Sequence, residues 1–331
     1  MIKKLLLALT IMVSPVLSSN ILAQDGPLTL KSITDGTFGA HGIYGVNPLD
    51  DGESYSQLVD GKRIVVSSFK TGEQTGVLFD VDNTKGKIKL SRIDGYTMSP
   101  NQKNILIRTK TQGIYRHSTT AVYYIYNVQN RTLAPLSDGG PQECPLWSPD
   151  GNMVGFVREG NLFIVKLLFD NAEVQVTKDG KFNSIINGKA DWVYEEEFVT
   201  NRSFDFNADG TVLAWIRYDE SQVPLFSFPI YKGMVPEIQA NAEYPGAYEY
   251  KYPIAGQPNS QVTVHTFDIK SRATRQVRVP LEAEGYIPRI KFSSDPNKLL
   301  ILTQNRHQDN LKVWVANPRS AECRCIVTDE V

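Results

Sequence analysis

A short phrase of sequence recurs four times between residues 99 and 302, and it restricts the architectures that the chain can adopt. In each copy an aromatic or apolar residue leads into a tight turn, and a short apolar strand follows. Asp and Gly suit such turns because they tolerate local hydrogen bonding and positive φ. The turns lie at residues 99–101, 147–151, 206–210 and 292–296, and the strands at 104–107, 153–157, 212–216 and 299–302.

The spacing of these turns fits a repeating unit of about four strands. The intervals are 49 residues from Ser99 to Ser148 and 59 from Ser148 to Asn207, with further strand signals at 121–128 and 161–168. The strands are mostly apolar on both faces, as expected where sheets pack face to face, and no amphipathic helix longer than about three turns interrupts them. Units of this size predict an all-β protein with a β-propeller fold. A β-sandwich is the alternative, but it would not show the recurring phrase.

The third interval is longer than one such unit. It spans 86 residues from Asn207 to Ser293 and includes a stretch, about 229–256, that is rich in Tyr, Pro and Glu. We expect an arm inserted into one blade, and a long surface loop is the alternative. Exposed aromatic residues on this arm would suit a contact surface; they are Tyr244, Tyr248, Tyr250 and Tyr252.

Residues 1–23 have the layout of a secretory signal peptide. Two lysines precede an apolar run at 5–13, and small residues lead to a cleavage site after Ala23. A membrane anchor is the alternative, but the run is far shorter than the roughly 20 residues needed to span a bilayer. We therefore expect an exported protein, periplasmic or secreted, with no membrane anchor after cleavage. Beyond the signal peptide we expect an N-terminal extended segment at 24–54 and a partial β-propeller at 55–331.

Charge and cysteine content argue against several kinds of function. The chain has 35 Lys and Arg against 36 Asp and Glu, so it lacks the basic excess of a nucleic-acid-binding protein. Cys144 is isolated, and Cys323 and Cys325 would project to the same face of a strand, too far apart for an easy disulfide. No CxxC pair or His cluster indicates zinc. We expect free thiols, no metal and no cofactor.

The segment 191–198, Asp-Trp-Val-Tyr-Glu-Glu-Glu-Phe, places three adjacent carboxylates among aromatic residues. Neighbouring like charges destabilise one another unless a cation compensates them. A glycosidase pair needs two carboxyls that face each other across a sugar, about 5 Å or more apart, which adjacent residues rarely achieve. A metal cage of oxygen ligands needs more ligands at loop spacing than the sequence offers. A clamp for a cation such as an ammonium group and a solvated acidic turn both stay open.

This acidic segment resembles the double-glutamate motif of dipeptidyl peptidase IV, in the prolyl oligopeptidase family of serine peptidases. Other segments resemble further markers of that family, in the family's order, so that the resemblance covers roughly residues 28–331. One departure is Ile254, where the family usually has a basic residue. The matching segments are 115–118 followed by 121–123, 219–221 with 223–224, 252–253 with 255–256 and Asn259, and 285–289.

The resemblance implies an eight-bladed propeller, of which about five blades are present here, in front of an α/β-hydrolase domain. The family removes dipeptides from free N-termini that have Pro or Ala as the second residue. By motif, Glu196 and Glu197 would grip the α-amino group of the substrate, and Glu195 would be the less direct member of the run. Arg116 would contact the peptide carbonyl of the bound dipeptide and help to hold the carboxylates. The inserted arm resembles the family's dimerisation arm, which implies a homodimer in the full-length protein.

The chain contains no Gly-x-Ser-x-Gly nucleophile elbow, so none of its residues is expected to be catalytic. We expect a fragment, namely the substrate-gating and N-terminus-binding region of an exported serine-type peptidase, inactive in proteolysis by itself. A stand-alone, non-catalytic propeller that binds peptides or protein partners is the alternative.

Overall fold

The computed structural model describes residues 28–331 apart from 40–41, 43 and 232–243. The predicted signal peptide therefore lies outside the described residues. The chain divides into two units at Gly45.

In the first unit, a five-residue helix, α1 (Leu30–Thr34), is capped by Thr29, whose hydroxyl accepts the N–H of Ser32 at 3.1 Å. The helix buries no side chain. The sequence therefore shows no hydrophobic periodicity by which this helix could be predicted, and the helix lies in the segment that was expected to be extended.

The second unit consists of antiparallel sheets that form five consecutive blades. The first blade is β1 (Asn47–Pro48), β2 (Ser54–Val59), β3 (Arg63–Ser68) and β4 (Gln74–Asp80). The second is β5 (Gly95–Met98), β6 (Asn104–Gly113), β7 (Thr119–Asn127) and β8 (Thr132–Pro135). The third is β9 (Gln142–Trp147), β10 (Met153–Arg158), β11 (Asn161–Lys166) and β12 (Ala172–Gln175). The second and third share one sheet because β7 pairs with β9.

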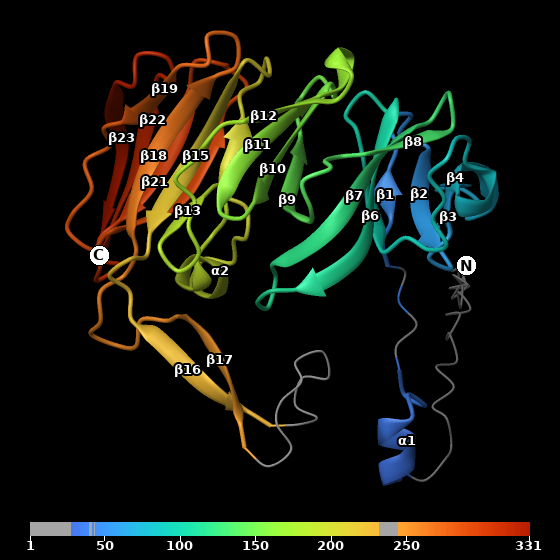
Figure 1. The fold of residues 1–331 in the computed structure, drawn as a ribbon, viewed down its shortest axis with the longest axis horizontal. Coiled ribbons are helices and arrows are strands. Elements are labelled where there is room, and N and C mark those ends of the chain that lie inside the picture. Colours follow the sequence, from blue (N-terminus) through green and yellow to red (C-terminus); the bar gives the residue numbers. More distant parts are fainter. Residues whose placement is uncertain (1–27, 40–41, 43, 232–243) are drawn as a thin grey trace, which may run out of the picture. The chain divides into compact units, whose positions relative to one another are not determined.

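The last two blades follow in the same order along the chain (Figure 1). The fourth is β13 (Ile185–Asn187), β14 (Phe204–Phe206), β15 (Val212–Asp219), β18 (Gln261–Asp268) and β19 (Thr274–Val277). The fifth is β20 (Tyr286–Phe292), β21 (Leu299–Gln304), β22 (Asn310–Ala316) and β23 (Cys323–Glu330). Short helices lie between strands: η1 (Val81–Asn83), η2 (Leu167–Phe169) and α2 (Trp192–Glu197). The predicted all-β fold, an incomplete propeller of about five blades, is confirmed.

Hydrophobic cores lie between successive blades, which explains why the strands are apolar on both faces. Along β6, Ile105 and Ile107 pack towards the first blade with Phe79, whereas Leu106 packs towards the third blade with Phe156. All five of these side chains are almost completely buried. Because successive residues of a strand point to opposite faces, one strand supplies two cores.

Three of the four recurring phrases fold into a turn with the same left-handed position, which Gln102, Gly151 and Gly210 occupy with φ of 55°, 70° and 66°. Ser or Asn closes the turn. The Ser148 hydroxyl and the Asn207 carboxamide oxygen each accept the N–H of the residue five positions on, at 2.9 and 2.8 Å. Asn207 also donates to the carbonyl of Pro296 in the next blade, at 3.2 Å. The phrase that marks each blade in the sequence thus also joins neighbouring blades.

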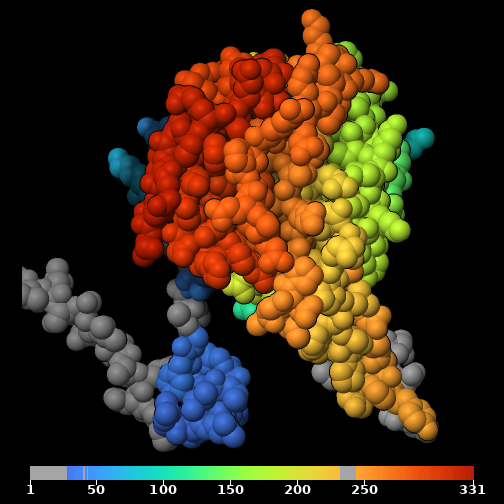
Figure 2. Space-filling view, turned by 90° about the vertical axis from the view of Figure 1, so that its left-hand side faces the viewer, coloured from blue at the N-terminus to red at the C-terminus, as the bar shows by residue number. Residues whose placement is uncertain are grey.

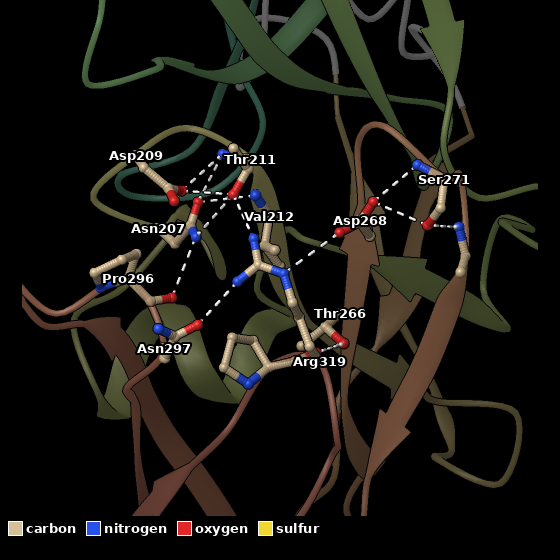
Figure 3. Close-up of polar contacts among 12 residues, drawn as sticks. Asn207, Asp209, Thr211, Val212, Thr266, Asp268, Ser271, Pro296, Asn297 and Arg319 are labelled. Carbon is tan, nitrogen blue, oxygen red and sulfur yellow. Dashed lines mark hydrogen bonds and ion pairs between the residues drawn. The ribbon is translucent and has the colours of Figure 1, made fainter.

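Arg319 makes a second connection at the junction of the fourth and fifth blades (Figure 3). Its guanidinium donates to Thr211 Oγ1 at 2.7 Å and to Asn297 Oδ1 at 2.9 Å, and its Nε lies 3.6 Å from Asp268 Oδ2. One side chain from the turn after β22 therefore contacts the ends of two neighbouring strands of the fourth blade, β15 and β18, and the residue that follows the recurring turn of the fifth.

The inserted arm is the hairpin of β16 (Leu225–Ile230) and β17 (Gly246–Lys251), which pair only with each other among the described strands. It leaves the fourth blade between β15 and β18 and projects as a narrow finger (Figure 2). The hairpin begins four residues before the predicted start at 229, because β16 follows Pro224 directly.

The predicted start of the propeller at 55 falls inside β2. The additional strand β1 was missed because both of its residues are exposed and carry no hydrophobic signal. No helix in the described ranges has both the length and the apolar character needed to cross a bilayer.

Candidate functional site

The acidic segment forms the short helix α2, and Asp191 starts it. The Asp191 carboxylate accepts the N–H of Tyr194 at 2.9 Å as the N-cap, and its second oxygen accepts the Ser260 hydroxyl at 2.5 Å. Asp191 is 5% exposed, and this burial raises the pKa of its carboxyl above the ordinary value. An acceptor at the N-cap satisfies one of the amides that a helix leaves unpaired at its start. The aspartate of the motif is therefore structural.

Tyr194 fixes the helix to the fifth blade. Its side chain is 1% exposed, and its phenol oxygen accepts the backbone N–H of Ile287 on β20 at 2.9 Å. Its ring contacts those of Tyr218, at a centroid distance of 4.9 Å, and Phe198, at 5.2 Å. A six-residue helix has little stability of its own. Its orientation therefore depends on such contacts.

The three glutamates that follow Tyr194 have different environments. Glu195 is fully buried, the Glu196 side chain is 15% exposed, and Glu197 is exposed. Successive helix residues point about 100° apart, so three adjacent carboxylates cannot share one face. The sequence places them together, but the helix separates them into one inward-facing and two outward-facing groups.

Arg116 reaches Glu196 from the second blade. It lies in the turn that joins β6 and β7, and its Nε is 2.8 Å from Glu196 Oε2. The arginine side chain is 71% exposed. The Glu197 side chain is exposed and makes no hydrogen bond or ion pair with the residues that the structure describes, so Arg116 pairs with Glu196 alone among the three glutamates.

Glu195 holds the same turn through its backbone. Its Oε1 accepts the N–H groups of His117 and Ser118, at 2.6 and 2.7 Å. Its Oε2 has no hydrogen-bond partner among the described residues. The structure thus brings together all four predicted residues, but Glu195 faces the protein interior, whereas Arg116, Glu196 and Glu197 face outward.

Aromatic rings from three elements surround these groups. Tyr250 on β17 lies 5.7 Å from Tyr115 in the β6–β7 turn and 6.4 Å from Trp192 on α2, and Trp192 lies 4.4 Å from Tyr252. Burial raises the pKa of Tyr115 well above its ordinary value, as does the nearby Glu220. The phenol therefore stays neutral, so Tyr115 adds no further negative charge beside the carboxylates.

Glu220, at the end of β15, is a buried acidic residue to which sequence reasoning assigned no role. It is 6% exposed, and burial, reinforced by the charge of Asp191, raises the pKa of its carboxyl to about 7. The sequence signal was present, because Glu220 belongs to one of the family-like segments, but nothing in the sequence indicated its burial.

The three cysteines are free thiols. The Cys144 thiol donates to the carbonyl of Asn201 at 3.3 Å, and burial raises its pKa to about 12. It therefore stays protonated and unreactive as a nucleophile. No group of three or more His, Cys, Asp or Glu residues in the described part of the chain is arranged to hold a metal ion.

The site can therefore bind a small cation with several hydrogen-bond donors. The carboxylates of Glu196 and Glu197 lie next to each other in the chain and only Glu196 is paired with a guanidinium, so the local charge is negative. An ammonium group offers three donors, and charge-assisted hydrogen bonds to carboxylates are about twice as strong as neutral ones.

Comparison with known proteins identifies the fold and the motif together. The family described as dipeptidyl peptidase IV (DPP IV) N-terminal region matches residues 99–331, which include Arg116 and the whole of α2. The chain belongs to this family. The family resemblance predicted from the motifs is confirmed.

Solved dipeptidyl peptidases have the same fold. The crystal structure of Porphyromonas gingivalis dipeptidyl peptidase 4 is 38% identical with a TM-score of 0.85, and the match covers 93% of this chain and 43% of that one. A putative dipeptidyl aminopeptidase IV from Bacteroides ovatus, 19% identical with a TM-score of 0.61, shows the fold alone; the match covers 88% of this chain and 38% of that one.

Curated relatives include a probable dipeptidyl-aminopeptidase B of Emericella nidulans. It is 30% identical over 336 residues, which cover 92% of this chain and 35% of the relative. The dipeptidyl-aminopeptidase B of Aspergillus niger is 30% identical over 260 residues, which cover 72% of this chain and 28% of the relative. The chain thus spans about a third of the length of the relatives it matches.

Proposed function

We propose that this region binds the free N-terminus of peptide substrates for an exported serine exopeptidase that releases Xaa-Pro and Xaa-Ala dipeptides. Glu196 and Glu197 accept the three donors of the substrate α-ammonium group, and Arg116 contacts the peptide carbonyl and orders Glu196. The observation that carries this proposal is the 2.8 Å contact between Arg116 and Glu196 beside the exposed, unpaired Glu197.

Electrostatics explain how such a site would select chain ends. A free α-amino group has a pKa of about 8, so it is charged at neutral pH. An acetylated or internal peptide nitrogen has neither the charge nor the three donors, and its binding would leave a desolvated carboxylate unpaired. A fixed distance between this clamp and a serine nucleophile would then place the second peptide bond at the point of cleavage.

The clamp can be tested by substitution in the full-length gene product that contains this chain. Glu196→Gln and Glu197→Gln should each lower kcat/KM for Gly-Pro-4-nitroanilide roughly 30-fold or more. This factor corresponds to a loss of about 2 kcal/mol of transition-state stabilisation, as expected when one partner of a desolvated charge pair is removed. The exposed Glu73 on the first blade supplies the matched control, since Glu73→Gln should leave kcat/KM unchanged. Near-wild-type turnover by both site variants would refute the clamp.

A binding measurement separates recognition from catalysis. Calorimetric titration should show that a free Ile-Pro peptide binds the protein and that its N-acetyl form binds at least about 30-fold more weakly. Affinity for the free peptide should fall as the pH rises through about 8, because the ligand loses its charge. Equal affinity for both peptides would exclude recognition of the ammonium group.

The remaining parts of the proposal concern the whole protein. We place the catalytic Ser, Asp and His in a hydrolase domain outside this chain, and we assign the arm of β16 and β17 to a homodimer contact. We also propose export to the periplasm or the medium after cleavage at Ala23. N-terminal sequencing of the protein from cell fractions tests export, and light scattering of the full-length protein with and without the arm tests dimerisation.

A further inference from the structure

Glu195 is an unusual residue for the interior of a protein. It is 0% exposed, and no cationic side chain pairs with it among the described residues. Both of its hydrogen bonds come to one oxygen from backbone amides, and the other oxygen has no partner. A buried, half-satisfied carboxylate is unfavourable compared with an apolar side chain of similar size. Stability alone therefore does not account for it.

The bonds of Glu195 connect two blades that are far apart in the sequence. Glu195 belongs to the fourth blade, whereas His117 and Ser118 lie in the β6–β7 turn of the second blade, 78 and 77 positions away. Figure 1 shows the β6–β7 end reaching towards α2. The same carboxylate thus joins the helix that carries Glu196 to the turn that carries Arg116.

Asn201 binds the carbonyl oxygen of His117, which belongs to the same peptide unit as the N–H of Ser118. Its side-chain amide donates to the carbonyl of His117 at 3.3 Å, and its own carbonyl accepts the Cys144 thiol at 3.3 Å. The N–H of His117 is bound by Glu195 and its C=O by Asn201, so the backbone directly after Arg116 is fixed from both sides.

The Arg116 side chain needs such support. It is 71% exposed, and its contact with Glu196 is its only polar contact within the described residues. A long exposed side chain loses much rotamer freedom when it is held in one geometry, so an isolated ion pair of this kind is weak. A rigid backbone at Arg116 reduces the conformational entropy that is still lost when the side chain pairs with Glu196.

We propose that Glu195, supported by Asn201, is a positioning residue that fixes the β6–β7 turn so that Arg116 meets Glu196. This inference rests on the proposed function, because it assigns Glu195 a role in assembling the clamp and no contact with the substrate. Charge is essential to the role, since a carboxylate binds two amides through one oxygen more strongly than a neutral carboxamide does.

A double-mutant cycle in the full-length protein tests the role. Glu195→Gln should raise KM for Gly-Pro-4-nitroanilide about tenfold and change kcat little. In an Arg116→Met background the same change should have less than about a threefold effect, because the group that Glu195 positions is already absent. An equal loss in both backgrounds would show a merely structural role, and wild-type kinetics for Glu195→Gln would also overturn the proposal.

Hydrogen exchange supplies a readout that does not depend on activity. Glu195→Gln should speed exchange of the His117 and Ser118 amides by about tenfold or more and leave the amides of β10 unchanged. Asn201→Ala, which leaves the buried carboxylate intact, should loosen the same turn and raise KM in the same direction, and it serves if Glu195→Gln does not fold. Unchanged exchange at both amides would refute positioning.

The outcome for the clamp itself is read separately. If Arg116→Met and Glu196→Gln leave the preference for free over acetylated peptides intact, the proposed function is wrong, whatever Glu195 does. If both variants abolish that preference and Glu195→Gln does not weaken binding, the clamp stands and the positioning role is refuted.

Discussion

Replacement of Tyr194 by Phe isolates one hydrogen bond that orients the candidate site. The substitution keeps the ring, and with it the contacts to Tyr218, Phe198 and Tyr286 at centroid distances of 4.9, 5.2 and 6.2 Å. It removes only the phenol oxygen, which accepts the N–H of Ile287 at 2.9 Å. Both residues are at most 1% exposed, so water cannot replace the lost acceptor without a local rearrangement.

The expected loss follows from that geometry. A neutral hydrogen bond contributes about 0.5–1.5 kcal/mol, and a buried donor left without a partner costs about 1–3 kcal/mol. We therefore expect Tyr194→Phe to lower the free energy of unfolding by about 2 kcal/mol, without the penalty of a large cavity. Because Ile287 belongs to β20, the loss should weaken the contact between α2 and the fifth blade.

Urea denaturation followed by Trp fluorescence measures the global effect, and hydrogen exchange at the Ile287 amide measures the local one. A loss of about 2 kcal/mol corresponds to roughly 30-fold faster exchange. Tyr218→Phe is the matched control, since Tyr218 is equally buried but its hydroxyl pairs at 2.6 Å with the hydroxyl of Ser203, a group that can rotate, and not with a fixed backbone N–H. Tyr218→Phe should lower the free energy of unfolding by about 1 kcal/mol. A Tyr194→Phe variant within 0.5 kcal/mol of wild type would show that the bond does not hold the helix.

Substitutions at three further positions test the surroundings of the site and the junction of the last two blades. Asp191→Ala should lower the unfolding free energy by about 1–2 kcal/mol through loss of the N-cap, whereas Asp191→Asn, which keeps an acceptor, should lose less; equal losses would exclude capping. The pKa of Glu220 lies at about 7 in the folded protein and near 4.5 otherwise, so its contribution to stability is complete below pH 4.5 and is lost as the pH rises to 7. Glu220→Gln should therefore stabilise the protein at pH 8 by up to about 3 kcal/mol and flatten the pH dependence of urea midpoints between these values, and an unchanged pH profile would contradict this. Arg319→Met should lower the unfolding free energy by about 1 kcal/mol, and a loss of less than about 0.3 kcal/mol would show that this surface network is incidental.

The candidate site is assembled from separate parts of the chain. Glu195 faces inward and binds the turn that carries Arg116, Glu196 contacts Arg116, and Glu197 is exposed. Loss of the inward carboxylate and loss of an outward one should therefore have different kinetic signatures, although the residues are adjacent in the sequence.

The sequence predicted the blades because the recurring turn has local causes. A Ser or Asn that closes the turn, and in two of the copies a Gly at the left-handed position, act within six residues and are therefore visible in the local sequence. It did not predict β1 or α1, since neither buries a side chain and each depends on local or neighbouring hydrogen bonds. The predicted start of the arm differs from the start of β16 because β16 is largely exposed, and buried and exposed residues alternate only weakly along it.

For the candidate site, the sequence by itself singled out the run of glutamates, because three adjacent carboxylates among aromatic residues are unusual, and the family resemblance added Arg116. Only the tertiary structure decided their roles. Residue order does not say which way a six-residue helix faces, and the burial of Glu195 follows from the packing of α2 against the turn of another blade. Burial and long-range contacts also set the protonation of Glu220, because desolvation arises only when distant strands enclose the carboxyl.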